Sequence, residues 1–122
     1  NMSDKMSIKK YIVQLLGNIS NENTLEKYNL FLVTAFGTIS GKFGTESDNN
    51  SCVIKSLCDK AFESYKEKYE LSSDYTISGN DGYIILKDAC ITNIQGTKSI
   101  FPELIVFFDQ IIAASLVAEK TL

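Results

Sequence analysis

The fold is decided by residues 30–43, LFLVTAFGTISGKF. The first half of this stretch is apolar at consecutive positions, which is typical of a strand buried on both faces. Gly37 can adopt a positive φ, so residues 36–38 are a predicted turn between two strands. Gly41 lies inside the second strand and indicates a bend or a close backbone approach. The sequence therefore predicts a bent hairpin within residues 29–45.

The last third of the chain predicts further strands. Residues 79–82, GNDG, indicate a hairpin turn, because glycine and asparagine accept positive φ. A loop over 95–102 ends at Pro102, the only proline, and Asp109 and Gln110 form a two-residue connection. The predicted strands are 75–78, 83–94, 103–108 and 111–117.

Two helices are predicted. The first covers residues 7–17, with Ser7 as its N-terminal cap and Gly17 as its end. The second covers residues 51–71 and lies between the second and third strands of the predicted core. Each has an apolar stripe at helical spacing, and the aromatic residues of the second stripe are expected to face the core or an interface. The stripes are Ile8, Tyr11, Ile12, Leu15 and Leu16 in the first helix, and Ile54, Cys58, Ala61, Phe62, Tyr65 and Tyr69 in the second.

Length and composition favour one folded domain over residues 1–122. Apolar residues make up 44% of the chain, which is close to the average of globular proteins. The net charge is −3, all twelve basic residues are lysines, and the chain has neither arginine nor histidine. Arginine is the usual reader of guanine and phosphate, so this composition disfavours nucleic-acid binding.

No catalytic or metal-binding constellation is visible. Without histidine, neither a Ser-His-Asp nor a Cys-His arrangement is possible. Asp81 and Asp109 lie in predicted turns, where aspartate commonly bonds the local backbone. Residues 37–41, GTISG, lack the Lys-Ser/Thr that completes a phosphate-binding loop. We therefore expect a protein that is not an enzyme and has no cofactor.

The three cysteines are Cys52, Cys58 and Cys90, an odd number without a C-x-x-C pair. They are expected to be free thiols in a reducing compartment, and a redox pair of Cys52 and Cys58 is the alternative. No apolar run approaches the ~20 residues of a membrane span. Because Lys9 and Lys10 interrupt any apolar N-terminal region, no signal peptide is predicted and a cytoplasmic location is expected.

The strand half resembles the Sm-like (LSm) small barrels, the fold of Sm proteins and of the bacterial RNA chaperones. Three segments carry the resemblance: residues 30–43, with glycines four positions apart; residues 81–89, DGYIILKDA; and residues 106–114, VFFDQIIAA. The resemblance implies a short N-terminal helix followed by a small, strongly bent, five-stranded antiparallel barrel. The predicted class is α+β, with the second helix as an insertion.

The resemblance also implies where RNA or another ligand would bind. Its pocket corresponds to the turn before the third long strand and to the last turn, so the candidate site residues are Asp81, Tyr83, Asp109 and Gln110. The family has a basic residue in the last turn, whereas this chain has Asp109, which repels phosphate. RNA is therefore a possible but disfavoured partner.

The last two strands are unusually apolar, and such a strand aggregates if its edge stays open, so either the barrel closes on itself or another subunit pairs with the strand. We therefore expect a homo-oligomer or another protein partner, with self-association through the strands of Val106, Phe108, Ile112 and Leu116. The predicted function is an oligomeric assembly or protein-interaction module. The alternatives are an RNA-binding Sm-like protein, or a small-ligand-binding accessory subunit with a pocket between the inserted helix and the strands.

Overall fold

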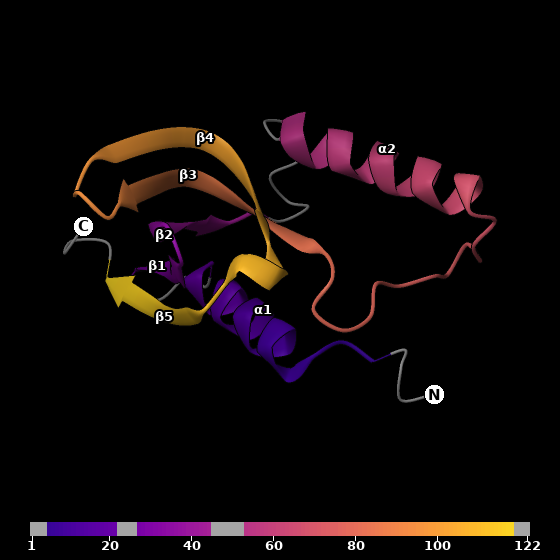
Figure 1. Ribbon diagram of the computed structural model, residues 1–122, viewed down its shortest axis with the longest axis horizontal. Coiled ribbons are helices and arrows are strands. Elements are labelled where there is room, and N and C mark those ends of the chain that lie inside the picture. Colours follow the sequence, from indigo (N-terminus) through magenta and orange to yellow (C-terminus); the bar gives the residue numbers. More distant parts are fainter. Residues whose placement is uncertain (1–4, 22–26, 45–52, 119–122) are drawn as a thin grey trace.

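The computed structural model describes residues 5–21, 27–44 and 53–118. Within these ranges the chain is α+β: two α-helices accompany a five-stranded antiparallel sheet of order β4-β3-β2-β1-β5 (Figure 1). The sheet is not closed, so the predicted barrel is not confirmed. The elements are α1 (Ile8–Ser20), β1 (Tyr28–Thr34), β2 (Gly37–Phe43), α2 (Val53–Lys68), β3 (Tyr83–Asn93), β4 (Lys98–Phe107), the 3₁₀ helix η3 (Phe108–Gln110) and β5 (Ala113–Ala118).

The predicted first hairpin is confirmed as β1 and β2. Its turn consists of Ala35 and Phe36, slightly earlier than predicted. Gly37 begins β2 with a φ of 147°, and a Cβ there would lie 2.2 Å from the carbonyl oxygen of Thr92 in β3. Only glycine fits this position, because both the backbone angle and the neighbouring strand exclude a side chain.

The predicted close approach at Gly41 is also confirmed. The register of β2 against β3 shifts between Ser40 and Lys42. The extra residue of β3 lies near Asp88, which has a φ of 52°. A Cβ at Gly41 would lie 3.0 Å from the carbonyl oxygen of Lys87. A bulge opposite a glycine increases the local bend of a sheet.

Helix α1 begins as predicted and ends later. The Ser7 hydroxyl accepts a hydrogen bond from the backbone N–H of Lys10 at 3.1 Å. The predicted end at Gly17 is wrong, because the helix continues to Ser20. Gly17 is buried, and a Cβ there would lie 2.7 Å from the ring of Phe43. The glycine therefore permits close packing of the helix on β2.

The apolar stripe of α1 is not buried against the core. Four members of its apolar stripe, Ile8, Tyr11, Ile12 and Leu15, are exposed, and Ile8 keeps 72% of its surface. Only Leu16 packs against the core. The buried face carries the other spacing: Lys10, Val13, Gly17 and Ser20. The helix thus presents its more polar face to the sheet.

The core lies inside the bent sheet, under α1. Its largest fully buried side chains share one cluster and come from β1, β3, η3 and α1: Leu30, Leu32, Leu86, Phe108 and Val13. Strands that precede α2 in the sequence and strands that follow it thus contribute to one core. The insertion of α2 into a single domain agrees with this arrangement.

Several predictions for the part of the chain after α2 are wrong. Residues 75–78 form no strand, so residues 79–82 are a bend in an irregular segment and not a hairpin turn. Strand β4 begins at Lys98, inside the predicted loop, and includes Pro102. Proline is tolerated there because β4 is an edge strand, and the N–H that it lacks is not needed on the open side. Strand β5 begins at Ala113, two residues later than predicted.

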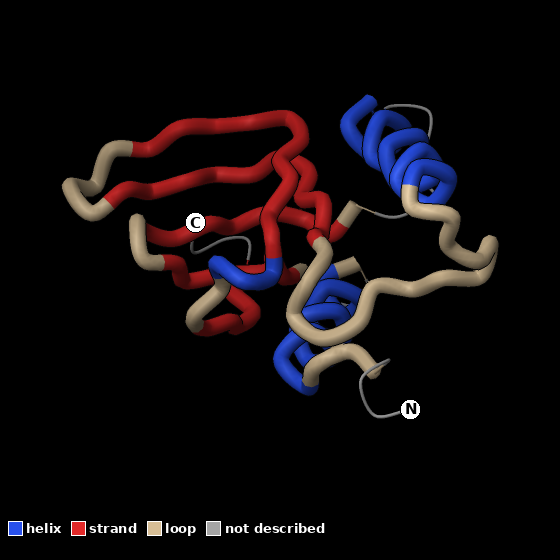
Figure 2. Tube along the Cα trace, turned by 45° about the vertical axis from the view of Figure 1, so that its right-hand side comes forward, coloured by secondary structure: helices blue, strands red, loops and turns tan. Residues whose placement is uncertain are grey.

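Helix α2 lies beside β4 and the start of β3, whereas α1 packs on β1, β2 and β5 (Figures 1 and 2). Helix α2 is shorter than the predicted 51–71, of which residues 51 and 52 lie outside the described ranges. None of its sixteen residues, all of them described, is buried. Glu103 of β4 holds its start, because one carboxylate oxygen accepts hydrogen bonds from the N–H groups of Val53 and Ile54 at 3.1 and 3.4 Å.

Candidate functional site

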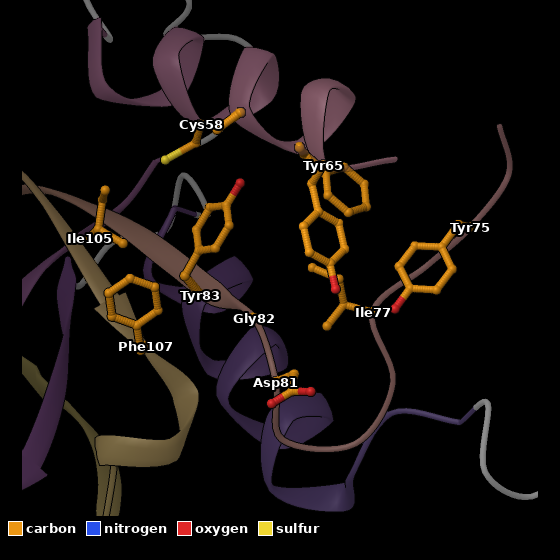
Figure 3. A pocket seen from close by; sticks show the side chains of 11 residues that line it. Cys58, Tyr65, Tyr75, Ile77, Asp81, Gly82, Tyr83, Ile105 and Phe107 are labelled. Atoms are coloured by element: carbon orange, nitrogen blue, oxygen red, sulfur yellow. The ribbon is translucent and has the colours of Figure 1, made fainter. Parts of the chain in front are cut away.

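A pocket of about 530 Å³ lies between α2 and the strands β3 and β4 (Figure 3). The alternative function of a small-ligand-binding subunit implies a pocket at this position, between the inserted helix and the strands. Its roof is part of the predicted α2 stripe, namely Cys58, Ala61, Phe62 and Tyr65. These residues of the stripe therefore lie on one face of α2, and that face lines a cavity instead of packing against the core.

Aromatic side chains dominate the pocket walls. Tyr83 rises from β3 towards α2, and Phe107 of β4 lies beside it (Figure 3). The rings of Tyr83 and Phe107 meet edge to face, with centroids 6.3 Å apart. The connection between α2 and β3 adds Tyr75 and Ile77 on the side opposite β4. The five rings of the lining are Phe62, Tyr65, Tyr75, Tyr83 and Phe107.

The phenol of Tyr83 points towards Cys58 on α2 (Figure 3). Burial, together with the neighbouring Cys58 thiol and the Asp59 carboxylate, raises the pKa of Tyr83 to about 12. Each of these three causes disfavours a negative charge on the phenol oxygen. Tyr83 is therefore a neutral hydrogen-bonding group inside the pocket at physiological pH.

Lys10 fastens the segment that forms the pocket floor. Its ammonium group donates to the carbonyl oxygens of Ile77, at 3.0 Å, and of Asp81, at 2.7 Å. It also lies 5.4 Å from the ring centre of Phe108. Burial lowers the pKa of Lys10, and the Asp81 carboxylate partly opposes that effect. A smaller cavity of about 340 Å³ beside Lys10 shares Tyr75 and Tyr83 with the main pocket.

Lys10 is not among the site residues predicted from the sequence. The available signal was its spacing, because Lys10, Val13, Gly17 and Ser20 recur at intervals of three or four and mark one helix face. Small residues at two of these positions are compatible with close packing. The apolar stripe of α1 is the stronger pattern, and it marks a different face of the helix.

The four candidate site residues lie on two adjacent segments of the chain, and only two of the four line the pocket. Asp81 and Tyr83 do so. Asp109 and Gln110 are exposed in η3. The N–H of Phe108 donates to the carbonyl oxygen of Gly82 at 3.1 Å, so the two segments are adjacent. The fold thus brings the two predicted turns together, and the pocket uses the first of them.

The residues predicted for self-association have different environments. Val106 and Phe108 are buried in the core of the protomer. Ile112 is exposed, and Leu116 is half-buried in β5. Two exposed apolar residues of β4, Ile100 and Phe101, lie in the predicted loop and were missed for that reason. The apolar surface at the β4 edge therefore lies nearer the β3–β4 hairpin than expected.

Cys58 and Cys90 are free, half-buried thiols, and Cys52 lies outside the described residues. Among residues 5–21, 27–44 and 53–118, no group of three or more His, Cys, Asp or Glu side chains is placed to hold a metal ion. In the same part of the chain, no helix has both the length and the apolar character needed to cross a membrane.

Known proteins offer no further guide to these sites. Comparisons of the chain with protein-family models, with curated proteins and with solved structures found no match.

Proposed function

We propose that this chain is a non-enzymatic assembly module whose copies associate through the edge strands β4 and β5. The observation that carries the proposal is the open sheet. Within the described residues, β4 pairs only with β3, and β5 pairs only with β1. Each edge thus offers backbone donors and acceptors to another strand, although the edge of β4 lacks a donor at Pro102.

The side chains around these edges support the same proposal. Natural edge strands are usually protected by charges or by covering loops. Ile100 and Phe101 are instead exposed on β4, and Ile112 is exposed immediately before β5. A second copy of the chain would cover these apolar groups and complete the backbone hydrogen bonding at once.

The outer face of α1 adds apolar surface. Ile8, Ile12, Leu15 and Ile19 recur at helical spacing, and all are exposed. The Lys9 ammonium donates to the carbonyl oxygen of Ile111 at 2.7 Å, which places the start of α1 beside the residue before Ile112. The apolar face of α1 and the β5 edge therefore form neighbouring parts of one contact surface.

Two assemblies are compatible with these edges. Pairing of β4 with β5 of the next copy is a head-to-tail contact, which gives a ring if the rotation closes. Pairing of one edge with its own copy gives a dimer. The resemblance to Sm-like proteins is part of the proposal, and it is supported by the helix that precedes five strands and by the bend at Gly41.

Size-exclusion chromatography with light scattering tests the proposal. The expected mass is a multiple of 13.6 kDa. The Ile100→Lys variant should shift the mass towards the monomer, because a lysine on an edge strand opposes strand pairing. Leu57→Lys is the matched control, since Leu57 of α2 is 58% exposed and Ile100 is 70% exposed. A wild-type chain that is purely monomeric at millimolar concentration would contradict the proposal.

A further inference from the structure

We propose that the pocket under α2 binds a small organic cation with an aromatic or alkyl body. This function is additional to assembly and does not depend on it, because the pocket is formed within one chain.

Helix α2 does not bury its own apolar face. An amphipathic helix in a globular protein normally packs that face against the core. Here Phe62 is only half-buried, while Ala61 and Tyr65 are exposed, although all three face the strands across the cavity. Ordinary protein interiors have few voids larger than a water molecule. A volume of about 530 Å³ instead falls in the range of small-molecule sites.

The shape of the chain around the pocket supports a built site. Glu103 holds the start of α2 from β4. Lys10 holds the carbonyl groups of Ile77 and Asp81 at the opposite end of the pocket. The roof and the floor are thus each fixed by hydrogen bonds to other elements, while the space between them is left open. This arrangement presents a preformed cavity to a ligand.

The chemistry of the lining favours a positively charged ligand. The face of an aromatic ring is negative and attracts a cation within about 6 Å. Five rings surround the pocket, and Asp81 is the one formally charged side chain among the described residues that line it. One ring already shows the preference, because the Lys66 ammonium lies 4.9 Å from the ring centre of Phe62. A cationic ligand would gain from both the rings and the carboxylate.

An anionic ligand would face the opposite situation. No lysine lines the main pocket among the described residues. Lys10, beside the smaller cavity, is bonded to two carbonyl oxygens. An anion would therefore approach Asp81 and the ring faces without a free positive partner. A neutral ligand would gain the apolar contacts only, so charge should separate the three ligand classes.

Isothermal titration calorimetry of the whole chain tests the proposal. The probes are benzyltrimethylammonium, benzyl alcohol and phenylmethanesulfonate, which share one ring and differ in charge. The cation should bind about tenfold more tightly than the neutral alcohol, and the sulfonate should bind most weakly. If the sulfonate binds as well as the cation, or if the cation does not bind, the proposal is wrong.

Matched variants place the binding in this pocket. Asp81→Asn should weaken binding of benzyltrimethylammonium by about tenfold, the loss expected for about 1.4 kcal/mol. Asp109→Asn should leave it unchanged, because that exposed aspartate does not line the pocket. Equal affinities of the two variants would contradict the proposal. Both variants keep the side-chain size, so the fold should persist and can be verified by circular dichroism.

A second pair of variants tests the rings. Tyr65→Leu should weaken binding of the cation by about fivefold, because leucine keeps apolar bulk and removes the ring. Tyr11→Leu on α1 is the control, since Tyr11 is 50% and Tyr65 is 49% exposed. An unchanged affinity in Tyr65→Leu would overturn the aromatic part of the proposal. The mass from light scattering should be the same with and without the probe, so this outcome is separate from that of the assembly test.

Discussion

The sheet with α1 and the insertion with α2 are built differently. The sheet buries its large side chains completely, and Phe108, Leu30 and Leu32 are all 0% exposed. Helix α2 buries no residue, and its apolar face lines a cavity. The fold therefore depends on the sheet, whereas the insertion is held at a few points and leaves room for a ligand. Five predictions test this difference, in order of decreasing effect.

Removing a core ring should have the largest effect. Phe108→Ala should lower the free energy of unfolding by about 3–5 kcal/mol, because it removes a fully buried ring and leaves a cavity. Phe62→Ala in α2 should cost only about 1 kcal/mol, since Phe62 is half-buried beside an existing cavity. Urea unfolding of the two variants measures the difference. Similar losses would show that α2 is as much a part of the core as η3.

Lys10 connects the two regions. Lys10→Met should lower the free energy of unfolding by about 2 kcal/mol, because two carbonyl groups lose a charged donor. Hydrogen exchange should accelerate at residues 77–82 and change little in β1. Lys68→Met is the control, since Lys68 is exposed on α2 and lies over the ring of Tyr69. Equal exchange rates in the two variants would contradict the role given to Lys10.

The lowered pKa of Lys10 also predicts a dependence on pH. The folded chain releases this proton at a lower pH than the unfolded chain does, so the unfolded chain binds more protons in the interval below 10.5. The stability of the wild type should therefore rise relative to Lys10→Met as the pH rises towards 10.5. Urea titrations of both proteins from pH 7 to 10 measure this difference. A fall in this relative stability with rising pH would mean that folding raises the pKa of Lys10 instead of lowering it.

Loss of the α2 cap should have a smaller effect. Glu103→Ala removes the carboxylate that accepts from Val53 and Ile54, and should cost about 1 kcal/mol. Hydrogen exchange should increase in the first turn of α2 while β1 and β2 keep their protection. Glu67→Ala, on the exposed side of α2, serves as the control. A uniform loss of protection across the sheet would contradict the separation of the two regions.

Tyr83 should have the smallest effect on stability and a clear spectroscopic signature. Its pKa is raised to about 12, so an absorbance titration at high pH should show a late step from its ionisation. The folded chain keeps this proton between pH 10 and 12, whereas the unfolded chain loses it, so stability should fall with pH in that interval. Tyr83→Phe should remove the late step. A late step that persists in this variant would assign it to another tyrosine.

Much of the secondary structure could be predicted from local patterns. The hairpin around Gly37, the cap at Ser7 and the long strand from Tyr83 follow from backbone preferences that need no distant partner. The strand at 75–78 was mispredicted because a β-prone run forms a strand only where another strand pairs with it. The start of β4 was missed because Pro102 indicates a loop, although an edge strand accommodates it.

The candidate site was predictable only in part. Asp81 and Tyr83 were identified through the turn that precedes β3, and both line the pocket. Phe107 and Tyr75 were missed because nothing in their local sequence separates a pocket wall from a core position. The spacing of Cys58, Phe62 and Tyr65 did show that these side chains share one helix face.

By itself the sequence determined the order of the helices and the main strands, the glycines at the close approaches, and the insertion of α2 into one strand pattern. Only the tertiary structure decided which face of α1 is covered, that Lys10 is buried, and that α2 stands over a cavity. The physical reason is that an apolar stripe specifies a face of a helix and not its partner. Burial depends on surfaces that distant segments supply. Here the sheet covers the face of α1 that contains Gly17, because this glycine allows the ring of Phe43 to approach the helix closely.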